Sequence, residues 1–316
     1  MLFRSPINID RNLAEPLSGL EWMAKQTVEG FITGLHKSPF HGFSVEFAEH
    51  RLYNSGDSLK HLDWKLLART DKMFLKRYEE ETNLRCHVLI DVSNSMNFPE
   101  VSPRANESKL SFSIFSTAIL FELFKRQRDA VGLSFFDDQL VFQSKASGSP
   151  THLERLYAEL ESLLERGPDR TAPIMTKMSS VLHQMAEEMP RRSLLVVFTD
   201  MLDFDENKEE VFAALQHLRF NKHEVVIFHT IKNNSEALLN LENRPYTFID
   251  PETQLEIKVN PKTVQQDYQT RWASWRSEWR MKCSQLQIDW VDVDIANGFQ
   301  EVMQTYLLKR QKMTSR

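Results

Sequence analysis

Three oxygen-bearing side chains, Asp91, Ser93 and Ser95, follow the apolar run at residues 86–90 with a spacing of two residues. Alternate residues of an extended chain point to the same side, so one carboxylate and two hydroxyls are expected to converge on a single point. Oxygen ligands of this kind suit a hard divalent cation, and Mg²⁺ in particular keeps several waters or accepts a ligand from a partner. The segment therefore predicts a metal site with open coordination positions.

The elements that would carry this site follow an α/β pattern. From residue 85 onward, apolar strands alternate with helices, which predicts a doubly wound, mostly parallel sheet with helices on both faces. The predicted elements are strand 85–91, helix 107–126, strands 130–136 and 139–143, helices 151–165 and 173–188, strand 194–198, helix 206–219, strand 225–228, an inserted hairpin at 244–259, helix 261–286, strand 288–293 and helix 299–310. A helix near 16–33 and an irregular charged and aromatic segment precede them. The predicted division is therefore residues 1–84 and residues 85–316.

Ligands of an open α/β sheet bind at the carboxyl ends of its strands, near a switch in strand order. Asp200 follows the strand at 194–198, and Thr171 lies in a loop before a helix. With Asp91, Ser93 and Ser95 they form a set of five oxygen ligands. The alternative is that the two serines cap the turn after the strand without any metal, since serine is favoured at such positions.

The order of these residues, Asp-x-Ser-x-Ser followed by a loop threonine and a later aspartate, resembles the metal-ion-dependent adhesion site of von Willebrand factor type A domains. A second resemblance covers roughly residues 40 to 205 and is carried upstream by Arg51-x-Tyr53-x-x-Gly56-Asp57, Asp63-Trp64-Lys65-x-x-Ala68-Arg69-Thr70 and Lys76-x-Tyr78-Glu79-Glu80-Glu81. This pattern is similar to the signature of the bacterial family known as domain of unknown function 58.

The resemblance implies that Ser93 and Ser95 ligate a metal through their hydroxyls, that Thr171 adds a third hydroxyl in some states, and that Asp91 and Asp200 act directly or through water. Thr176 is the alternative for the threonine. The implied ion is Mg²⁺, with Mn²⁺ or Ca²⁺ as substitutes. Such a shell leaves positive charge on the ion, so a partner's Asp or Glu is expected as the next ligand.

The same resemblance implies a frequent association with MoxR-type AAA+ ATPases, in a chaperone-like or assembly role. The expected partner is therefore such an ATPase or the client on which it acts.

Composition narrows the function classes. A chain of 316 residues with 41% hydrophobic content permits a large core, and a net charge of -5 argues against general nucleic-acid or membrane-surface binding. No window approaches the roughly 18 apolar residues of a membrane span, and the first residues lack the apolar core of a signal peptide. A cytoplasmic location without a membrane span is expected. Two cysteines without a CxxC spacing are expected to be buried thiols.

The motifs point away from catalysis. The chain has neither a Gly-x-x-x-x-Gly-Lys loop nor a Gly-x-Ser-x-Gly elbow. A phosphoryl-transfer hydrolase that used Asp91 as its nucleophile would need an acid/base partner, and Ser93 stands where a second carboxylate is usual. A non-catalytic interaction module is therefore expected, and a metal-free structural scaffold and this hydrolase stay open as alternatives.

Two patterns near the C-terminus have structural explanations. Trp272, Trp275 and Trp279 recur at helical spacing, which favours core packing over a groove for a partner. Asp292 and Asp294 end the last strand, where capping of the following turn is favoured over a second metal site.

Overall fold

The computed structural model describes residues 19–32, 46–52, 64–70, 72–79, 84–99, 108–166, 178–201, 208–250 and 255–314. They fall into two units, one formed by residues 40–84 and the other by residues 1–39 and 85–316. In the smaller unit, strand β1 (Glu46–Leu52) pairs antiparallel with β2 (Phe74–Glu79), and helix α2 (Trp64–Thr70) lies between them in sequence.

The larger unit includes helix α1 (Gly19–Ile32), which was predicted to belong with the segment 1–84. Its buried side chains, among them Met23 and Val28, pack toward helix α3, and Glu21 accepts a hydrogen bond from the Lys125 ammonium at 2.7 Å. The helix joins the larger unit because its apolar stripe needs a second helix to cover it.

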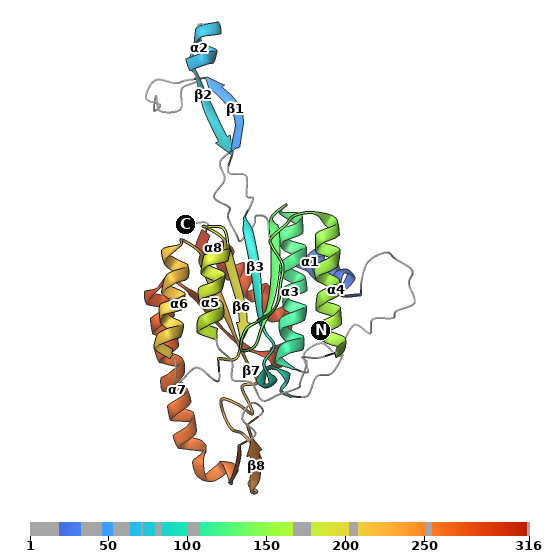
Figure 1. The fold of residues 1–316 in the computed structure, drawn as a ribbon, viewed down its shortest axis with the longest axis vertical. Helices are drawn as coiled ribbons and strands as arrows, with labels where there is room; N and C mark the ends of the chain where they lie inside the picture. Colours follow the sequence, from blue (N-terminus) through green and yellow to red (C-terminus); the bar gives the residue numbers. More distant parts are fainter. Residues whose placement is uncertain are drawn as a thin grey trace, which may run out of the picture. The chain divides into compact units, whose positions relative to one another are not determined.

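A six-stranded sheet with the order β10-β7-β6-β3-β4-β5 forms the centre of the larger unit (Figure 1). Its strands are, in chain order, β3 (Arg85–Asp91), β4 (Ala130–Phe136), β5 (Leu140–Gln143), β6 (Leu194–Thr199), β7 (Glu224–Ile231) and β10 (Asp289–Asp294). All neighbouring pairs are parallel except β4 and β5. The predicted mostly parallel α/β sheet is confirmed, and the strand bounds agree with the sequence pattern to within a few residues.

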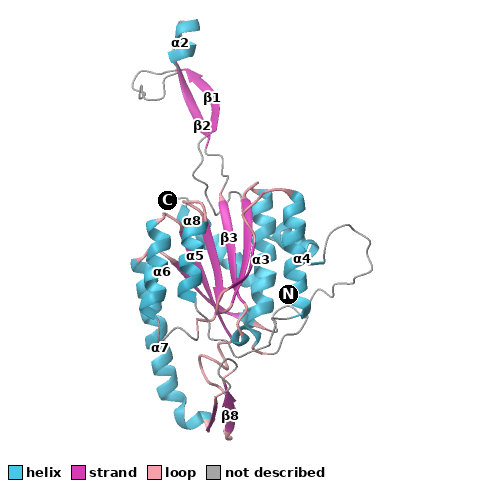
Figure 2. Cartoon of the chain, in the orientation of Figure 1, coloured by secondary structure: helices cyan, strands magenta, loops and turns pink. Residues whose placement is uncertain are grey.

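Helices cover both faces of this sheet (Figure 2). They are α3 (Lys109–Arg126), α4 (Pro150–Arg166), α5 (Met178–Glu188), α6 (Lys208–Phe220), α7 (Pro261–Gln285) and α8 (Phe299–Thr314), with α1. Among the helices that the structure describes, none combines the length and the apolar content that a bilayer span requires.

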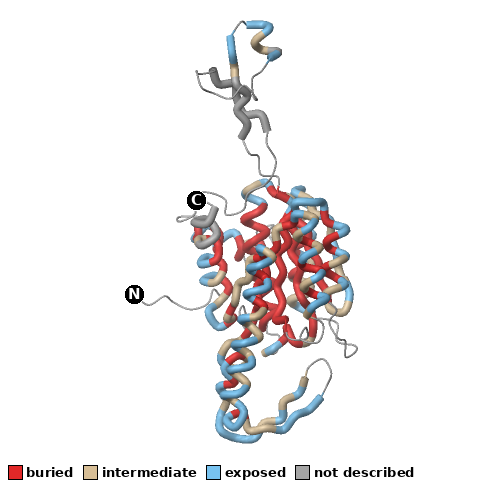
Figure 3. The backbone as a smooth tube through the Cα atoms, turned by 90° about the vertical axis from the view of Figure 1, so that its left-hand side faces the viewer, coloured by how far each residue is buried: buried red, intermediate tan, exposed pale blue. Residues whose placement is uncertain are grey.

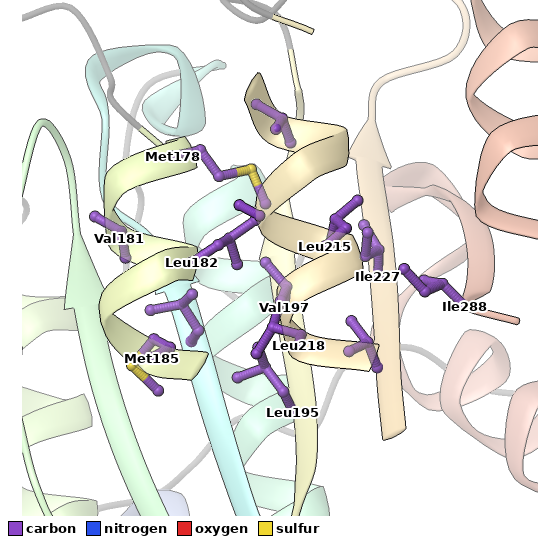
Figure 4. Close-up of a cluster of buried hydrophobic side chains, with 14 of the residues drawn as sticks. Met178, Val181, Leu182, Met185, Leu195, Val197, Leu215, Leu218, Ile227 and Ile288 are labelled. Carbon is purple, nitrogen blue, oxygen red and sulfur yellow. The ribbon is translucent and has the colours of Figure 1, made fainter. Parts of the chain in front are cut away.

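Alternate residues of each strand point to opposite faces of the sheet, so apolar strands contribute side chains to a core on both faces. On one face, Leu195 and Val197 of β6 and Ile227 of β7 pack against α5 and α6, with Leu215 fully buried at the centre (Figure 4). The central strands are buried along their length, whereas the outer faces of the covering helices are exposed (Figure 3). Cys86 and Cys283 are buried free thiols, as predicted.

Helix α3 lies in the other layer, in contact with α1, α4 and α8, and is buried from Lys109 to Phe124. Most of these residues are apolar or small on every side of the helix, as burial all round requires, and the charged Lys109 and Glu122 are buried with ion-pair partners. Ser108 caps its first turn by accepting a hydrogen bond from the Ser111 amide at 3.0 Å.

An inserted hairpin of β8 (Tyr246–Ile249) and β9 (Glu256–Val259) precedes α7, as the sequence predicts. The tryptophan row of α7 packs inward: Trp279 is buried, and Trp275 lies 5.4 Å from the buried ring of His229, measured between ring centroids. The core-packing prediction is confirmed for Trp279 and, at the edge of the same cluster, for Trp275, whereas Trp272 is half-buried and stacks on His229 at 6.1 Å between ring centroids.

The two aspartates of the last strand have separate structural roles. Asp294 accepts a hydrogen bond from the Ala296 amide at 3.1 Å and caps the 3-10 helix η3 (Ile295–Asn297), which confirms the capping prediction. Asp292 instead bonds the Arg280 guanidinium at 2.6 Å and the His229 ring at 3.3 Å.

Candidate metal site

The candidate site lies where β3 and β6 end, at the centre of the sheet. From β3 the chain crosses to β4 on one side, and it later returns to β6 on the other side of β3, so the strand order switches between these two strands. This is the position at which open α/β sheets bind ligands. Asp91 is the last residue of β3, and Asp200 follows β6 directly. The two predicted carboxylates therefore meet at the predicted edge.

Asp91 is held by two hydrogen bonds and is almost completely buried. Its Oδ1 accepts from the Ser93 amide at 3.0 Å, and its Oδ2 accepts from the Thr199 hydroxyl at 2.7 Å. Burial and the nearby charge of Asp200 raise the pKa of Asp91 to about 7, although the hydrogen bonds from Ser93 and Thr199 act in the opposite direction. The site thus holds negative charge that its surroundings compensate only in part.

Ser93 and Ser95 also meet here, because their hydroxyl oxygens lie 3.0 Å apart. The geometry differs from the predicted extended chain: the strand ends at Asp91, and Ser95 lies in the 3-10 helix η2 (Asn94–Asn97). The turn, rather than strand alternation, brings the second hydroxyl next to the first. Ser93 is the N-cap residue of η2, but its side chain makes no capping hydrogen bond. Capping alone therefore does not account for Ser93.

A lysine that the sequence analysis did not single out completes the site. Lys109, the first residue of α3, has a fully buried side chain, and its ammonium lies 2.5 Å from Asp200 Oδ2 and 2.7 Å from Glu236 Oε1. Burial would lower the pKa of Lys109, but Asp200 and Glu236 outweigh it and raise the pKa above its ordinary value. The ammonium is therefore charged and carries one fixed positive charge into the site.

The sequence contained a weak signal for this lysine. A cation in the first turn of a helix is unfavourable beside the positive end of the helix dipole, so Lys109 directly after the Ser108 cap requires a local reason. Its two carboxylate partners supply that reason, but they are 91 and 127 residues away in sequence.

Glu236 is held in place by the segment that leaves β7. Its Oε2 accepts from the Lys232 amide at 2.6 Å, and its backbone carbonyl accepts from the Tyr268 hydroxyl of α7 at 2.6 Å. The ammonium of Lys109 therefore connects Asp200 to a braced segment.

The donor set fits a hard divalent cation. Within the described ranges, no cluster of three or more His, Cys, Asp or Glu side chains could hold a metal, so an ion would depend on the two serine hydroxyls together with Asp91 and Asp200. The amide nitrogen and oxygen of the Asn97 side chain, in the same 3-10 helix, are buried without a hydrogen-bond partner among the described residues. A buried polar group without a partner is costly, and a bound ion or water is one way to satisfy it. The predicted threonine ligand, Thr171, and its alternative, Thr176, lie outside the described residues.

A protein-family model described as "Protein of unknown function DUF58" matches residues 49–278, which include every residue of the site discussed above. That match covers more than half of the chain. The chain belongs to the DUF58 family. The resemblance seen in the charged and aromatic segment before β3 is thereby confirmed.

Relatives of this DUF58 chain include an uncharacterized protein of Mycobacterium bovis and an uncharacterized protein of Mycobacterium tuberculosis. Each is 33% identical over 193 residues, which is 61% of this chain and 58% of the relative. The chain thus matches less than two thirds of the length of these relatives.

Solved structures similar to the DUF58 chain include the conserved hypothetical protein BatB from Bacteroides thetaiotaomicron, with 14% identity, a TM-score of 0.42, and 72% of this chain and 99% of that chain covered. The VWA domain of SpRpn10 matches with 15% identity and a TM-score of 0.33, over 47% of this chain and 76% of that chain. The fold assignment rests on the strand order and pairing described above.

Proposed function

We propose that this DUF58 chain is a non-catalytic, metal-dependent protein-interaction module. Asp91, Ser93, Ser95 and Asp200, with Thr171 as a further hydroxyl, would hold Mg²⁺, or Mn²⁺ or Ca²⁺ in its place. The single observation that carries this proposal is the meeting of two buried carboxylates and two hydroxyls at the switch point of the sheet.

The charge balance of the site supports binding of an acidic partner group. A bound divalent ion would supply an open coordination position for a carboxylate, because only two of the proposed protein ligands carry negative charge. Asp91 and Asp200 hold their places through contacts within the chain. The Ser93 and Ser95 hydroxyls are neutral, so this shell leaves more positive charge on an ion than a carboxylate-rich cage would, and the Lys109 ammonium offsets the charge of Asp200. A partner's Asp or Glu is therefore the preferred additional ligand.

The proposed partner is a MoxR-type AAA+ ATPase or its client, with the chain as an adaptor or chaperone-like factor in the cytoplasm. This part of the proposal rests on the family resemblance, because DUF58 members are associated with such ATPases. No nucleic acid takes part in the proposed role.

A metal-free scaffold is the second candidate, and Lys109 is the observation that favours it. The ammonium already neutralises part of the negative charge of Asp200, so the site carries a cation of its own. A phosphoryl hydrolase has less support, because both oxygens of Asp91 accept hydrogen bonds and the chemistry needs an acid/base partner beside the nucleophile.

The proposal is tested by a pull-down from native lysate with the chain as bait, in Mg²⁺ and separately in EDTA. Asp91→Ala removes a proposed ligand, and Asp267→Ala removes an exposed carboxylate of α7 as the matched control. Retention of an ATPase or its client in Mg²⁺ by the unmodified chain and the control, but not by Asp91→Ala or in EDTA, is expected. Equal retention by all three baits in both buffers would favour the metal-free scaffold instead.

A further inference from the structure

Lys109 is an unusual neighbour for a cation site. Its side chain is fully buried, and its ammonium is hydrogen-bonded to one oxygen of Asp200 and to Glu236. A residue needed only to bury α3 would be apolar, because a lone buried ammonium is costly unless carboxylates surround it. Lys109 is instead placed where it acts directly on one of the proposed metal ligands.

The contact changes Asp200 in two ways. It orients the carboxylate by holding Oδ2 at 2.5 Å, so a cation that binds this oxygen must compete with the ammonium. It also offsets the negative charge of Asp200, because the carboxylate already interacts with an ammonium and therefore attracts a metal ion less strongly. Asp91, in contrast, accepts from neutral donors among the described residues, which include the Ser93 amide and the Thr199 hydroxyl.

Glu236 keeps the ammonium in this position. Two hydrogen bonds fix this glutamate. Its side-chain Oε2 accepts from the Lys232 amide, and its backbone carbonyl accepts from the Tyr268 hydroxyl. Lys109 therefore bridges Asp200 to a braced segment and stays beside the site.

We propose that Lys109 is a positioning residue that keeps the affinity of this site for a divalent cation low until a carboxylate from a partner joins the ion. The proposal deepens the proposed function and rests on it. The fixed positive charge repels the cation directly and weakens Asp200 as a ligand, and an added carboxylate offsets both effects. Cation and carboxylate therefore bind cooperatively, so that the site is filled mainly when a partner is present.

The test measures Mn²⁺ binding to the whole chain by electron paramagnetic resonance of the free ion, with and without acetate as the model carboxylate. In the unmodified chain, acetate is expected to tighten Mn²⁺ binding by at least about fivefold, the lower end of typical coupling between two ligands. Lys109→Met, which keeps the length of the side chain and removes its charge, is expected to bind Mn²⁺ about tenfold more tightly without acetate and to lose most of the acetate effect, since a tenfold change needs only about 1.4 kcal/mol.

Two further variants separate positioning from other causes. Lys109→Met leaves Glu236 without its ammonium, so the double variant Lys109→Met/Glu236→Gln removes both charges and is expected to bind Mn²⁺ as tightly as the single variant. Tightening that occurs in the single variant alone would show that Glu236 has become a new ligand and would overturn the proposal. Lys208→Met removes a partly buried lysine that pairs with Glu278 and is expected to leave both measurements unchanged.

The outcomes distinguish this inference from the proposed function. If the unmodified chain binds Mn²⁺ and acetate tightens it equally in all variants, Lys109 is a structural brace and only the inference fails. If the unmodified chain binds no Mn²⁺ with or without acetate, the metal-dependent function fails and the inference with it. Urea unfolding of each variant verifies that the fold is retained, and a variant that has lost the fold is replaced by Lys109→Gln, for which the same results are expected.

Discussion

Replacing Asp91 with asparagine is expected to stabilise the protein at pH 8 when EDTA removes divalent ions. Burial and the charge of Asp200 raise the pKa of Asp91 from 3.8 to about 7. The folded state therefore holds the proton more tightly than the unfolded state does. The resulting stability is fully present below about pH 4 and is lost as the pH rises through about 7.

The magnitude follows from the pKa shift. At 1.36 kcal/mol for each pH unit, the full loss is about 4 kcal/mol, of which about 3 kcal/mol falls between pH 5 and pH 8. Asparagine carries no charge and avoids this loss. Its amide cannot accept from both the Ser93 amide and the Thr199 hydroxyl, which costs about 1 kcal/mol at every pH.

Urea unfolding at pH 5 and pH 8 measures the effect as the difference in unfolding free energy between Asp91→Asn and the unmodified protein. That difference is expected to shift in favour of the variant by about 3 kcal/mol from pH 5 to pH 8. Taking the difference removes the contributions of titrating groups that do not interact with Asp91. Asp267→Asn, at an exposed position on α7, should follow the unmodified protein. Parallel pH profiles for Asp91→Asn and the unmodified protein would refute the charge balance described for the site.

Three other predictions concern the site and the core. Ser95→Ala is expected to weaken Mn²⁺ binding, measured by electron paramagnetic resonance. The hydrogen bond to Ser93 that it loses should lower the unfolding free energy by only about 1 kcal/mol. An unchanged Mn²⁺ affinity would show that Ser95 is not a ligand. Leu215→Ala leaves a cavity between α6 and the sheet and is expected to lower the unfolding free energy in urea by about 2–5 kcal/mol. A loss below about 1 kcal/mol would contradict the packing described. Burial lowers the pKa of His87 to about 4, with Glu188 acting in the opposite direction, so this residue's stabilisation is lost as the pH falls from about 6.5 toward 4. His87→Gln should therefore lose about 2 kcal/mol less than the unmodified protein between pH 7 and pH 4.5 in urea unfolding, and an equal loss would argue against a buried neutral imidazole.

Local pattern was sufficient for most of the fold. The strands at 85–91 and 194–199 are continuous apolar runs, which are typical of parallel strands buried on both faces, and the helices between them keep a helical period. Because the alternation of strand and helix restricts the topology, the doubly wound sheet follows from the order of these elements. The general rule for ligand sites in such sheets then points to Asp91 and Asp200.

Two predictions differed from the structure. Both were made from local sequence pattern, which carries no information on how distant elements pack. Ser95 was predicted on an extended chain, but the strand ends at Asp91 and a 3-10 helix follows. Helix α1 was predicted with the segment before β3, but it packs against α3 in the larger unit. Elements distant in sequence take part in both: the Val92 amide, beside the turn, donates to the Phe136 carbonyl of β4 at 2.8 Å, and α1 contacts α3.

By itself, the sequence determined the α/β fold, the carboxylate and hydroxyls at the end of β3, and membership of the DUF58 family, because all three depend on residues that are neighbours or repeat at a regular period. Only the tertiary structure decided that the ammonium of Lys109 lies between Asp200 and Glu236. Burial and charge pairing depend on which distant elements meet, and neither can be read from the order of the residues along the chain.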